Sequence, residues 1–521
     1  MGTLRPFVLF VPMSIFITAA VASLVDLDSF FGFAKGLNDW ILAHFATLIV
    51  WAVFGFVLTI IGVVVSPLGR VRIGGPDAEP ILSIWQWFSI TLCTTIAIGI
   101  LFWAMAEPIN HLYQPGGRDY TPGGEDAQDF ALVSLFMHWA ISPYSIYTVA
   151  GLTFALAYHN LGKPYSVSGP FHALFGRSPH PMVAAILDSS ILVALVMGMA
   201  ASLGAGMLMM ASGISSQTGL ENGPMLLALV ALGIGLTVLI SSLTGLLKGI
   251  RILSDINTRF FFVFVAIIFV FGPTLAILSQ GGEAILNYAR DFVPRSLFLG
   301  EAAGDHEWAF DWTIVYFANW LAWAPVTAMF LGRIAIGYTV RAFVLVNLVL
   351  PAMFSMLWMS VFGVFAIETD TATNGALATV ATEQGIEAVI FEAMKSLPLT
   401  ELLVPILLCL AFISYVTAAD SNTEAISQIC RRHDHGPESN DDELESGPKL
   451  KIVWVLLLAG MAWVMVAFSG VDGVRMLSNV GGLPALFIVI GLQLALIRMA
   501  FRHSQIGAAS FQSAELVDGR T

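Results

Sequence analysis

The feature that most constrains this chain is the recurrence of long apolar runs. A run of about 20 apolar residues can cross the hydrocarbon core of a bilayer as a helix, because a helix bonds its own backbone polar groups. Only 11% of the 521 residues are charged, whereas charged residues make up about 25% of a soluble domain. The sequence therefore predicts an all-α polytopic membrane protein with twelve transmembrane helices. The runs lie near residues 5–24, 38–65, 85–106, 128–158, 182–213, 224–245, 257–280, 312–331, 338–366, 398–424, 450–469 and 476–500.

The basic residues predict how these helices are oriented. With the N-terminus in the cytoplasm, 17 of the 23 lysines and arginines fall in cytoplasmic segments, as the positive-inside rule requires. An even number of spans then places both termini in the cytoplasm. The first run, 5–24, also resembles a cleavable signal peptide, but we favour a retained helix because the topology needs it. In the acidic outside loop 367–397, residues 385–397 predict a short helix along the membrane surface.

The later runs fall into two groups of five. Residues 1–84 hold two N-terminal helices, spans three to seven occupy 85–280, and spans eight to twelve occupy 312–500. The segment 281–311 is predicted to be an extracytoplasmic loop, and 501–521 a short cytoplasmic tail. An odd number of helices per group inverts the second group in the membrane, so the pattern fits two inverted five-helix repeats.

Several classes of function lack their sequence signals. Cys93, Cys409 and Cys430 show no paired spacing, which excludes a disulfide framework and most thiolate metal sites. The ten histidines are scattered without a metalloprotease motif, and the chain has no GxxxxGK[ST] phosphate loop. The net charge of −13 lies in loops and the tail and gives no reason to expect nucleic acid. We therefore expect no catalytic site, no metal, no ATP drive and no nucleic-acid partner.

The eighth run is rich in tryptophan where a plain membrane anchor would carry leucine and valine. Residues 312–331 contain three tryptophans, and helical spacing places Phe317, Trp320 and Ala324 on one face. Pro325 frees a backbone carbonyl, which lipid disfavours unless protein or a watery cavity lies beside it. These residues fit either a packing seam or an aromatic cage for a cation, in which each ring contributes roughly 0.5–2 kcal/mol.

The fourth run carries a second aromatic cluster, in which Trp139, Tyr144 and Tyr147 surround Pro143. Two such clusters on two proline-containing runs are harder to explain as packing than one. The neighbouring His138 is expected to make a hydrogen-bonded helix contact rather than to bind a ligand.

Three runs contain segments that favour a broken helix. They are 93–99 in span three, 198–206 in span five and 414–421 in span ten. Hydroxyls and unwound carbonyls at such breaks can hold a sodium ion. Close packing of small residues also explains 198–206, and we slightly favour it for this region. In span ten, Asp420 inside an apolar stretch indicates either a site or a paired structural contact.

Longer motifs connect these clusters. The segments DWTIVYFANW, WAPVTAMFLGRIAIGYTVRAF, MHWAISPYSIY, FWAMAEP, SLGAG, LLKGIRILSDIN and TAADS together resemble the betaine/choline/carnitine transporter (BCCT) family over nearly the whole chain. The resemblance implies a leucine-transporter-type fold with two inverted five-helix repeats. It also implies a homotrimer in the lipid bilayer of the cell inner (plasma) membrane and a small onium substrate with a trimethylammonium-like or dimethylsulfonium-like head.

Carried over position by position, the resemblance implies a cage of residues around the substrate and a path by which the substrate leaves toward the cytoplasm. The matching cage positions are Trp139, Tyr144, Tyr147 and Trp320, although many relatives have tryptophan at the position of Tyr144. Trp323 matches a tryptophan toward the cytoplasmic exit.

The chain also departs from the family pattern. Asn319 stands where the family usually has tryptophan, and residues 95–99 replace a glycine-rich stretch, so Asn319, Thr95 and Ile96 are further candidates for substrate contact. Asn319 adds a donor and an acceptor. It could face a carboxylate, a hydroxyl, a sulfonate or a less methylated amine, or it could point away from the site.

Candidates for an ion site are Thr417, Ser202 and Cys93. Sodium-coupled relatives commonly have a Thr-Ser pair where this chain has Thr417 and Ala418, so one hydroxyl ligand is missing. Because of this missing ligand, the resemblance implies the substrate cage more directly than it implies coupling to a sodium ion.

We predict a secondary active transporter that imports a small methylated onium compound of the betaine, choline, carnitine or dimethylsulfonium type, as an osmoprotectant or nutrient. Symport with a cation is favoured over substrate/product exchange or proton coupling. A non-transporting membrane sensor is the alternative from another class. The short non-basic tail predicts uptake without strong osmotic activation.

Overall fold

The computed structural model describes residues 4–95, 99–116, 118–164, 166–177, 179–244, 247–300, 305–431, 448–503 and 506. Within these residues every regular element is a helix, so the all-α class is confirmed. The helices are α1 (Pro6–Val25), α2 (Leu27–Val65), η1 (Pro67–Arg70), α3 (Ile84–Thr95), α4 (Gly99–Tyr113), α5 (Glu125–Trp139), α6 (Ile141–Ala155), η2 (Leu156–Asn160), α7 (Phe171–Phe175), α8 (Pro181–Thr218), α9 (Pro224–Thr244), α10 (Leu247–Phe271), α11 (Thr274–Ser296), α12 (Asp305–Ala309), η3 (Phe310–Ile314), α13 (Val315–Arg333), α14 (Val340–Val344), η4 (Leu345–Val349), α15 (Leu350–Ala372), α16 (Ala376–Glu383), η5 (Ile386–Ala388), α17 (Val389–Met394), α18 (Thr400–Ile429) and α19 (Pro448–Phe501).

Each predicted apolar run coincides with one or more of these helices. Judged by length and composition, the described residues contain eight helices able to cross a membrane, or up to ten if each of two bent pairs is one span. The count differs from twelve partly because α9 contributes only a short apolar stretch. The last two predicted runs also share α19, which Gly470 divides with φ 52° and ψ −133°, a conformation open to glycine. That the chain has twelve transmembrane helices stays a prediction.

The predicted breaks differ among the three spans. α3 and α4 are bent by 59° relative to each other, and residues 96–98 between them lie outside the described part of the chain. For 414–421 the expectation is wrong, because this stretch lies inside the uninterrupted helix α18. The stretch 198–206 lies inside the uninterrupted helix α8, so close packing, the favoured of its two explanations, accounts for it. Small residues serve packing there: the ring of Tyr415 lies so close to Gly206 that any Cβ would overlap it.

Span four breaks between α5 and α6. Ala140, the residue between them, has φ −113° and ψ −117°. Pro143 explains this break, since a proline lacks the backbone donor and its ring clashes with the carbonyl four residues earlier, that of Trp139. The break leaves Trp139 at the end of one helix and Tyr144 in the first turn of the next.

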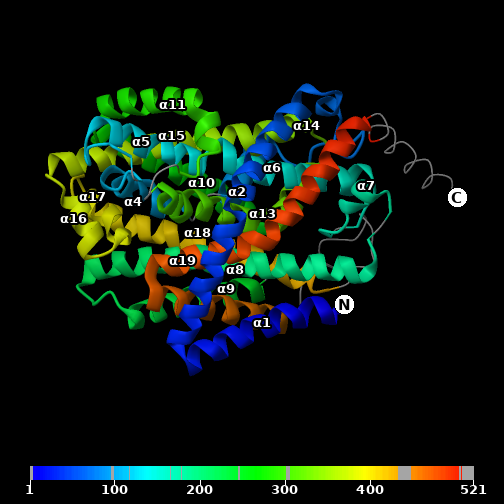
Figure 1. Ribbon diagram of the computed structural model, residues 1–521, viewed down its shortest axis with the longest axis horizontal. Coiled ribbons are helices and arrows are strands. Elements are labelled where there is room, and N and C mark those ends of the chain that lie inside the picture. Colours follow the sequence, from blue (N-terminus) through cyan, green and yellow to red (C-terminus); the bar gives the residue numbers. More distant parts are fainter. Residues whose placement is uncertain are drawn as a thin grey trace.

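The seventh predicted run turns sharply at Gly272 and Pro273. α10 and α11 meet at 113°, so the helix expected to reach residue 280 ends at Phe271. α11 then lies along the rim of the molecule (Figure 1). Most of the segment 281–311, expected to be a loop, is therefore helical.

The segment 385–397 forms η5 and α17 but does not lie along the surface as expected. Val389, Ile390, Phe391 and Met394 are buried, and α17 packs against α4 and α15. Its apolar side chains therefore contact protein rather than the bilayer.

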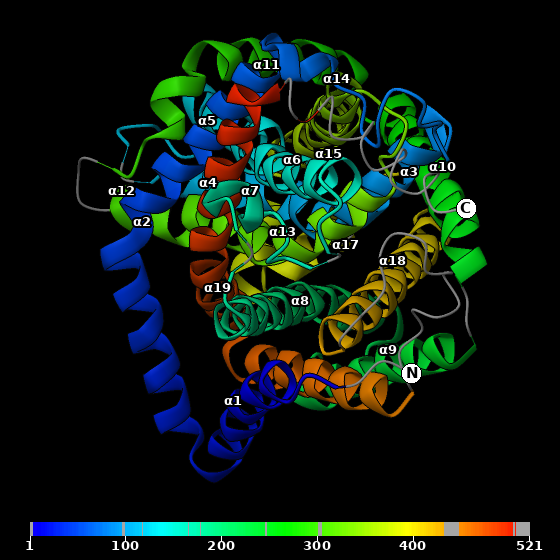
Figure 2. The ribbon, with the colours of Figure 1, turned by 90° about the vertical axis from the view of Figure 1, so that its right-hand side faces the viewer.

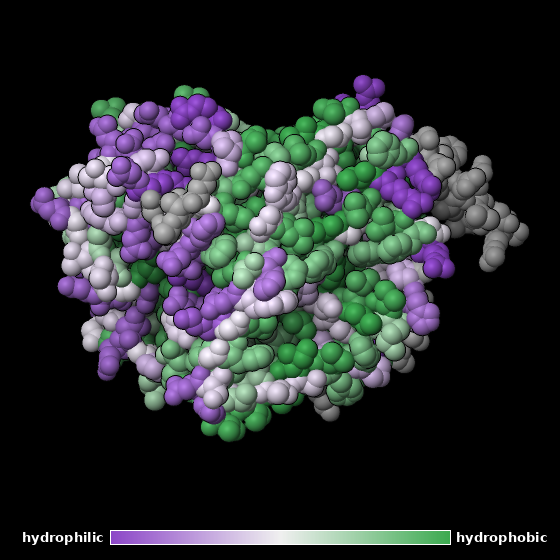
Figure 3. Space-filling view, viewed as in Figure 1, coloured by the Kyte–Doolittle hydropathy of each residue, from purple (hydrophilic) through white to green (hydrophobic). Residues whose placement is uncertain are grey.

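α13 occupies the centre of the bundle. It packs against α6, α8 and α19, and other helices surround it in both views (Figure 1, Figure 2). The start of α1 and the end of α19 lie toward the same end of the molecule (Figure 1), as an even number of crossings requires. Apolar side chains dominate the middle of the face in Figure 3, and polar ones gather toward its left and right ends, which fits a bundle that spans a bilayer.

The crossing of α13 and α19 depends on a glycine. A Cβ on Gly482 would lie 2.6 Å from the Cα, Cβ and carbonyl oxygen of Ala318. Without one, the two backbones approach closely, as small residues permit in membrane helices. One turn earlier on α19, Ser478 accepts a hydrogen bond of 3.1 Å from Asn319 on α13.

We expect Gly482→Ala to lower the free energy of unfolding by roughly 1–3 kcal/mol, as overpacking does elsewhere. Gly460→Ala, on the same helix with no atom within 4 Å of its Cβ, is the matched control and should be neutral or stabilising by up to about 1 kcal/mol. Thermal unfolding in detergent compares the two variants. Equal melting temperatures would contradict the close crossing.

Candidate functional site

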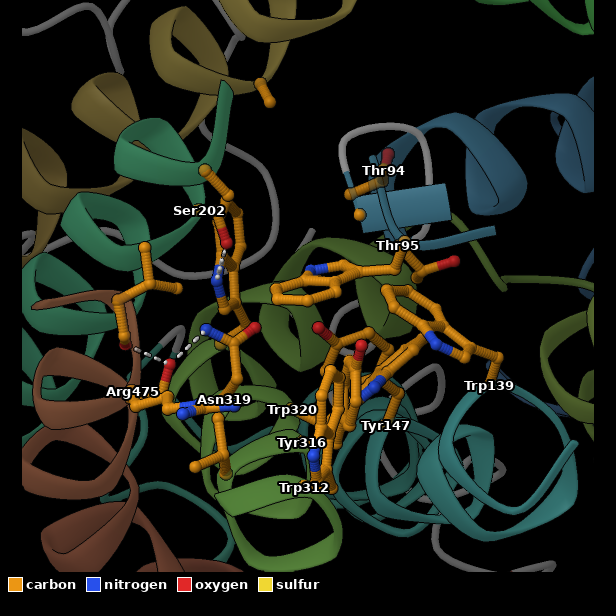
Figure 4. A pocket seen from close by; sticks show the side chains of 18 of the residues that line it. Thr94, Thr95, Trp139, Tyr147, Ser202, Trp312, Tyr316, Asn319, Trp320 and Arg475 are labelled. Carbon is orange, nitrogen blue, oxygen red and sulfur yellow. Dashed lines mark hydrogen bonds between the residues drawn. The ribbon is translucent and has the colours of Figure 1, made fainter. Parts of the chain in front are cut away.

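A cavity of about 70 Å³ lies beside α13. The labelled side chains in Figure 4 divide into an aromatic side, with Trp139, Tyr147 and Trp320, and a polar side, with Ser202 and Asn319. The residues that line the cavity are Cys93, Thr94, Thr95, Gly99, Trp103, Trp139, Tyr147, Ser202, Ala205, Asp311, Trp312, Val315, Tyr316, Asn319, Trp320, Trp323, Ala418, Val474, Arg475 and Ser478.

Trp320 is the centre of the aromatic side. The centroid of its ring system lies 5.9 Å from that of Trp139, 5.2 Å from that of Tyr144 and 5.0 Å from that of Tyr147. The planes are inclined by 54–72°, the edge-to-face range that aromatic pairs prefer. Helices α5, α6 and α13 thus bring together the four predicted cage rings.

The predicted residues do not all reach the cavity. Trp139, Tyr147, Trp320, Asn319, Trp323 and Thr95 line it. Tyr144 is fully buried behind Trp320, with its hydroxyl 3.5 Å from Oγ1 of Thr95, and supports the wall rather than forming it. Ile96 lies outside the described residues. That these side chains bind a substrate stays a prediction.

Sequence reasoning missed three further rings. Trp103, Trp312 and Tyr316 continue the aromatic side, with Trp103 at 5.6 Å from Trp312 and 5.7 Å from Tyr316. Trp312, Tyr316 and Trp320 recur every four residues, a helical stripe that the sequence already contains.

Phe317 and Ala324, which helical spacing places on the same face of the helix as Trp320, do not line the cavity. Both side chains are fully buried and lie outside the cavity wall. Several stripes on α13 are apolar, and only the packing of its neighbours decides which one faces the cavity.

A buried carboxylate holds Trp139 in place. Oε2 of Glu107 accepts a hydrogen bond of 2.9 Å from Nε1 of Trp139. Oε1 accepts from Nδ1 of His138 at 2.6 Å and from Nε2 of His111 at 3.2 Å. All four residues are buried, so three donors compensate the cost of burying the carboxylate. His138 is the hydrogen-bonded helix contact that its position predicts.

The partner of His111 fixes where its proton lies. Trp308 Nε1 can only donate, so Nδ1 of His111 accepts at 3.1 Å and Nε2 carries the proton that faces Glu107. His111 is therefore satisfied as a neutral imidazole. Nδ1 of His138 donates to the carboxylate of Glu107, and its Nε2 lies 3.0 Å from Oγ1 of Thr313, a hydroxyl that can donate or accept.

Glu107, His111 and His138 also have the composition of a metal site, with ligand atoms within 4.8 Å of one another. A metal at Nε2 of His111 would displace the proton to Nδ1, where it would face the N–H of Trp308. The surrounding donors thus fit a hydrogen-bonded carboxylate and not a metal ion.

Asn319 presents an acceptor to the cavity. The hydroxyl of Ser478 donates to the carbonyl of Val474 at 2.8 Å, so it can only accept from Asn319, and Nδ2 must face it. Oδ1 of Asn319 has no hydrogen-bond partner among the described residues and lies on the cavity side (Figure 4). This acceptor can bond an N–H or O–H donor but not a carboxylate.

Two of the three predicted ion ligands, Ser202 and Cys93, line the cavity. The hydroxyl of Ser202 accepts the indole N–H of Trp323 at 3.2 Å. Sγ of Cys93 lies 3.3 Å from Oγ1 of Thr258. Thr417 donates to the carbonyl of Ile413 and does not line the cavity, whereas its neighbour Ala418 does. Sodium binding stays a prediction.

A second, apolar cavity of about 20 Å³ lies beyond Trp323. Trp323 and Ala418 line both cavities, so these two side chains form the partition between them. At its other end the first cavity reaches Asp311, whose side chain is 53% exposed. The first cavity thus extends from the protein surface to this partition.

A family model and several known proteins match most of the chain. The family model described as "BCCT, betaine/carnitine/choline family transporter" matches residues 7–505. An ectoine/hydroxyectoine transporter of Virgibacillus pantothenticus is 30% identical, over 89% of this chain and 90% of its own length. A probable glycine betaine transporter of Desulfitobacterium hafniense is 27% identical, over 84% of this chain and 85% of its own.

Among solved structures, a Na⁺-coupled sialic acid symporter in a substrate-bound outward-open state is similar at 11% identity. The TM-score is 0.44, over 87% of this chain and 86% of that one. A likeness this distant supports no inference.

The hydrogen bond between Glu107 and Trp139 can be tested without any ligand. We expect Glu107→Gln and Trp139→Phe to interact by about 1.5–3 kcal/mol in a double-mutant cycle on the free energy of unfolding, as a bond to a buried charged group should. Glu368→Gln, whose carboxylate accepts from Gln280 instead, is the matched control and should be additive with Trp139→Phe. Additive effects of the Glu107 and Trp139 changes would contradict the bond.

Proposed function

The chain belongs to the betaine/carnitine/choline transporter family, and on that basis we propose that it imports a small methylated onium compound, driven by a cation gradient. Members of this family are transporters, so the chain is a membrane transporter of the betaine/ectoine type and not an enzyme. The onium compounds that we consider are betaine, choline, carnitine and dimethylsulfonium compounds.

The observation that supports this substrate class is the group of rings around Trp320. A quaternary ammonium has no N–H to donate and is held instead by ring faces, at roughly 0.5–2 kcal/mol per ring. Trp139, Tyr147, Tyr316 and Trp320 all line the cavity, so a methylated head could contact several rings at once. The carboxylate of Glu107 behind Trp139 adds a negative charge on the same side.

The two cavities support transport rather than binding alone. A transporter must open its site to each side of the membrane in turn, which requires a barrier that can move. Trp323 and Ala418 form such a barrier, and the indole of Trp323 is fixed by a single hydrogen bond to Ser202. We propose that the Asp311 end faces outward and the Trp323 end faces the cytoplasm.

The proposal also includes the coupling ion and the oligomeric state. We propose sodium as the coupling ion, with substrate/product exchange as the alternative mechanism, since Thr417 does not line the cavity and the hydroxyl of Ser202 bonds Trp323. We further propose a homotrimer in the cell inner membrane with both termini in the cytoplasm. The shared end of α1 and α19 supports the last point (Figure 1).

Uptake by purified protein in liposomes tests the function. We expect accumulation of at least one labelled methylated onium compound, stimulated by an inward sodium gradient. Trp320→Ala should reduce uptake to background, because it removes the ring that the other cage residues contact. Trp51→Ala, an exposed tryptophan on α2, is the control and should retain uptake. Sodium-independent counterflow would indicate exchange, and binding without flux would indicate a sensor.

Asn319→Leu tests whether the amide faces the substrate. Leucine has a similar size but no acceptor, so affinity for onium heads that bear an N–H should fall about three- to tenfold, the effect of one lost hydrogen bond. Affinity for trimethylammonium heads should stay within about twofold, because they offer no donor. Competition against a labelled substrate measures both. An unchanged profile would show that Asn319 does not contact the head.

A further inference from the structure

Arg475 lies in the wall of the cavity that holds the aromatic rings. It belongs to α19 and stands three residues before Ser478, whose bond to Asn319 ties this helix to α13. Its guanidinium carbon lies 5.3 Å from the centroid of the Trp312 ring system. Among the described lining residues, Arg475 carries the one positive charge and Asp311 the one negative charge.

The guanidinium uses only one nitrogen to pair with protein carboxylates. Nη1 lies 3.0 Å from Oδ1 of Asp472 and 3.5 Å from Oδ2 of Asp311. Nε and Nη2 have no hydrogen-bond partner in the part of the chain that the structure describes. These two nitrogens form one edge of the guanidinium, and such an edge binds a carboxylate through two parallel hydrogen bonds.

The two aspartates are more exposed than the guanidinium that they contact. The side chains of Asp472 and Asp311 are 73% and 53% exposed, whereas that of Arg475 is 22% exposed. Water weakens the attraction between exposed charges, so these pairs leave the Nε–Nη2 edge of the guanidinium able to bind a further carboxylate.

Trp312 connects this side to the aromatic rings. Its ring system stacks on that of Tyr316, with centroids 6.3 Å apart, while Arg475 lies against the same tryptophan (Figure 4). A cavity that attracts a cation at one side and an anion at the other suits a molecule carrying both charges. A molecule with only the cation would contact the rings but would leave the guanidinium edge without a carboxylate.

We propose that Arg475 is a specificity-determining residue, whose Nε–Nη2 edge binds the carboxylate of a zwitterionic onium substrate and discriminates against onium compounds without an acid group. This inference rests on the proposed function and narrows its substrate class.

Glycine betaine and choline provide the test, since they share a trimethylammonium head and differ in bearing a carboxylate or a hydroxyl. Calorimetry on the purified full-length protein gives both dissociation constants. We expect the wild-type protein to bind glycine betaine about ten- to hundredfold more tightly than choline, the worth of a charge-assisted pair of bonds. Arg475→Gln should reduce this ratio to about one, chiefly by weakening betaine binding.

Two further variants separate this effect from misfolding. Arg475→Lys keeps the charge but loses the planar edge, so its ratio should lie between those of the wild type and Arg475→Gln. Arg290→Gln, an exposed arginine on α11 that pairs with Asp291, should leave the ratio unchanged. Thermal unfolding shows whether each variant is folded.

The outcomes distinguish this inference from the proposed function. Equal binding of choline and betaine by the wild type, or an unchanged ratio in folded Arg475→Gln, would overturn the role of Arg475 and leave onium transport standing. Failure of the wild type to bind either compound or any other onium compound would overturn the proposed function and this inference together.

Discussion

The structure depends on the compensation of one carboxylate, that of Glu107, at the centre of an apolar bundle. An uncompensated charge there would cost several kcal/mol, so its donors must be present whenever the protein is folded. They come from the helix of Glu107 itself, as His111, and from α5, as His138 and Trp139. Each histidine is bonded in turn to α12 or η3, just before α13. The network thus fixes three neighbouring segments relative to one another and sets the angle of a cage tryptophan.

Much of this arrangement is predictable from the sequence, because its signals are local. Long apolar runs predicted the helices, and Pro143 predicted a disturbance in span four that the structure places at Ala140. The helices and this disturbance follow from rules that act within a few residues: hydrophobicity, helical spacing and the missing donor of proline. That the aromatic residues of α6 and α13 meet was implied by the family resemblance instead, and the ring centroids of Trp320 and Tyr147 lie 5.0 Å apart.

The features that the sequence did not predict depend on contacts between distant segments. Phe317 and Tyr316 are adjacent on α13, and only the positions of α4 and α5 decide that Tyr316 faces the cavity. Small residues in α8 fitted either a break or close packing, and only the structure shows that one of them admits the ring of Tyr415. Nothing near Arg475 in the sequence shows that α19 turns its side chain toward Trp312.

The arrangement of charges in the cavity also limits the shape of what can bind. Rings attract a methylated cation over a broad face and fix its position weakly, whereas a guanidinium edge requires a carboxylate in its own plane. If Arg475 binds the carboxylate as proposed, a substrate must reach it while its head contacts the rings, so the separation of its two charges becomes a condition for binding. Asn319 lies beside Trp320 along α13. Because its Nδ2 donates to Ser478, its Oδ1 is the atom of the amide that can accept a hydrogen bond in the cavity. A compact head with an N–H could use that oxygen, while a trimethylammonium head must rely on the rings alone. The cavity can thus distinguish substrates at both ends without any change in the backbone.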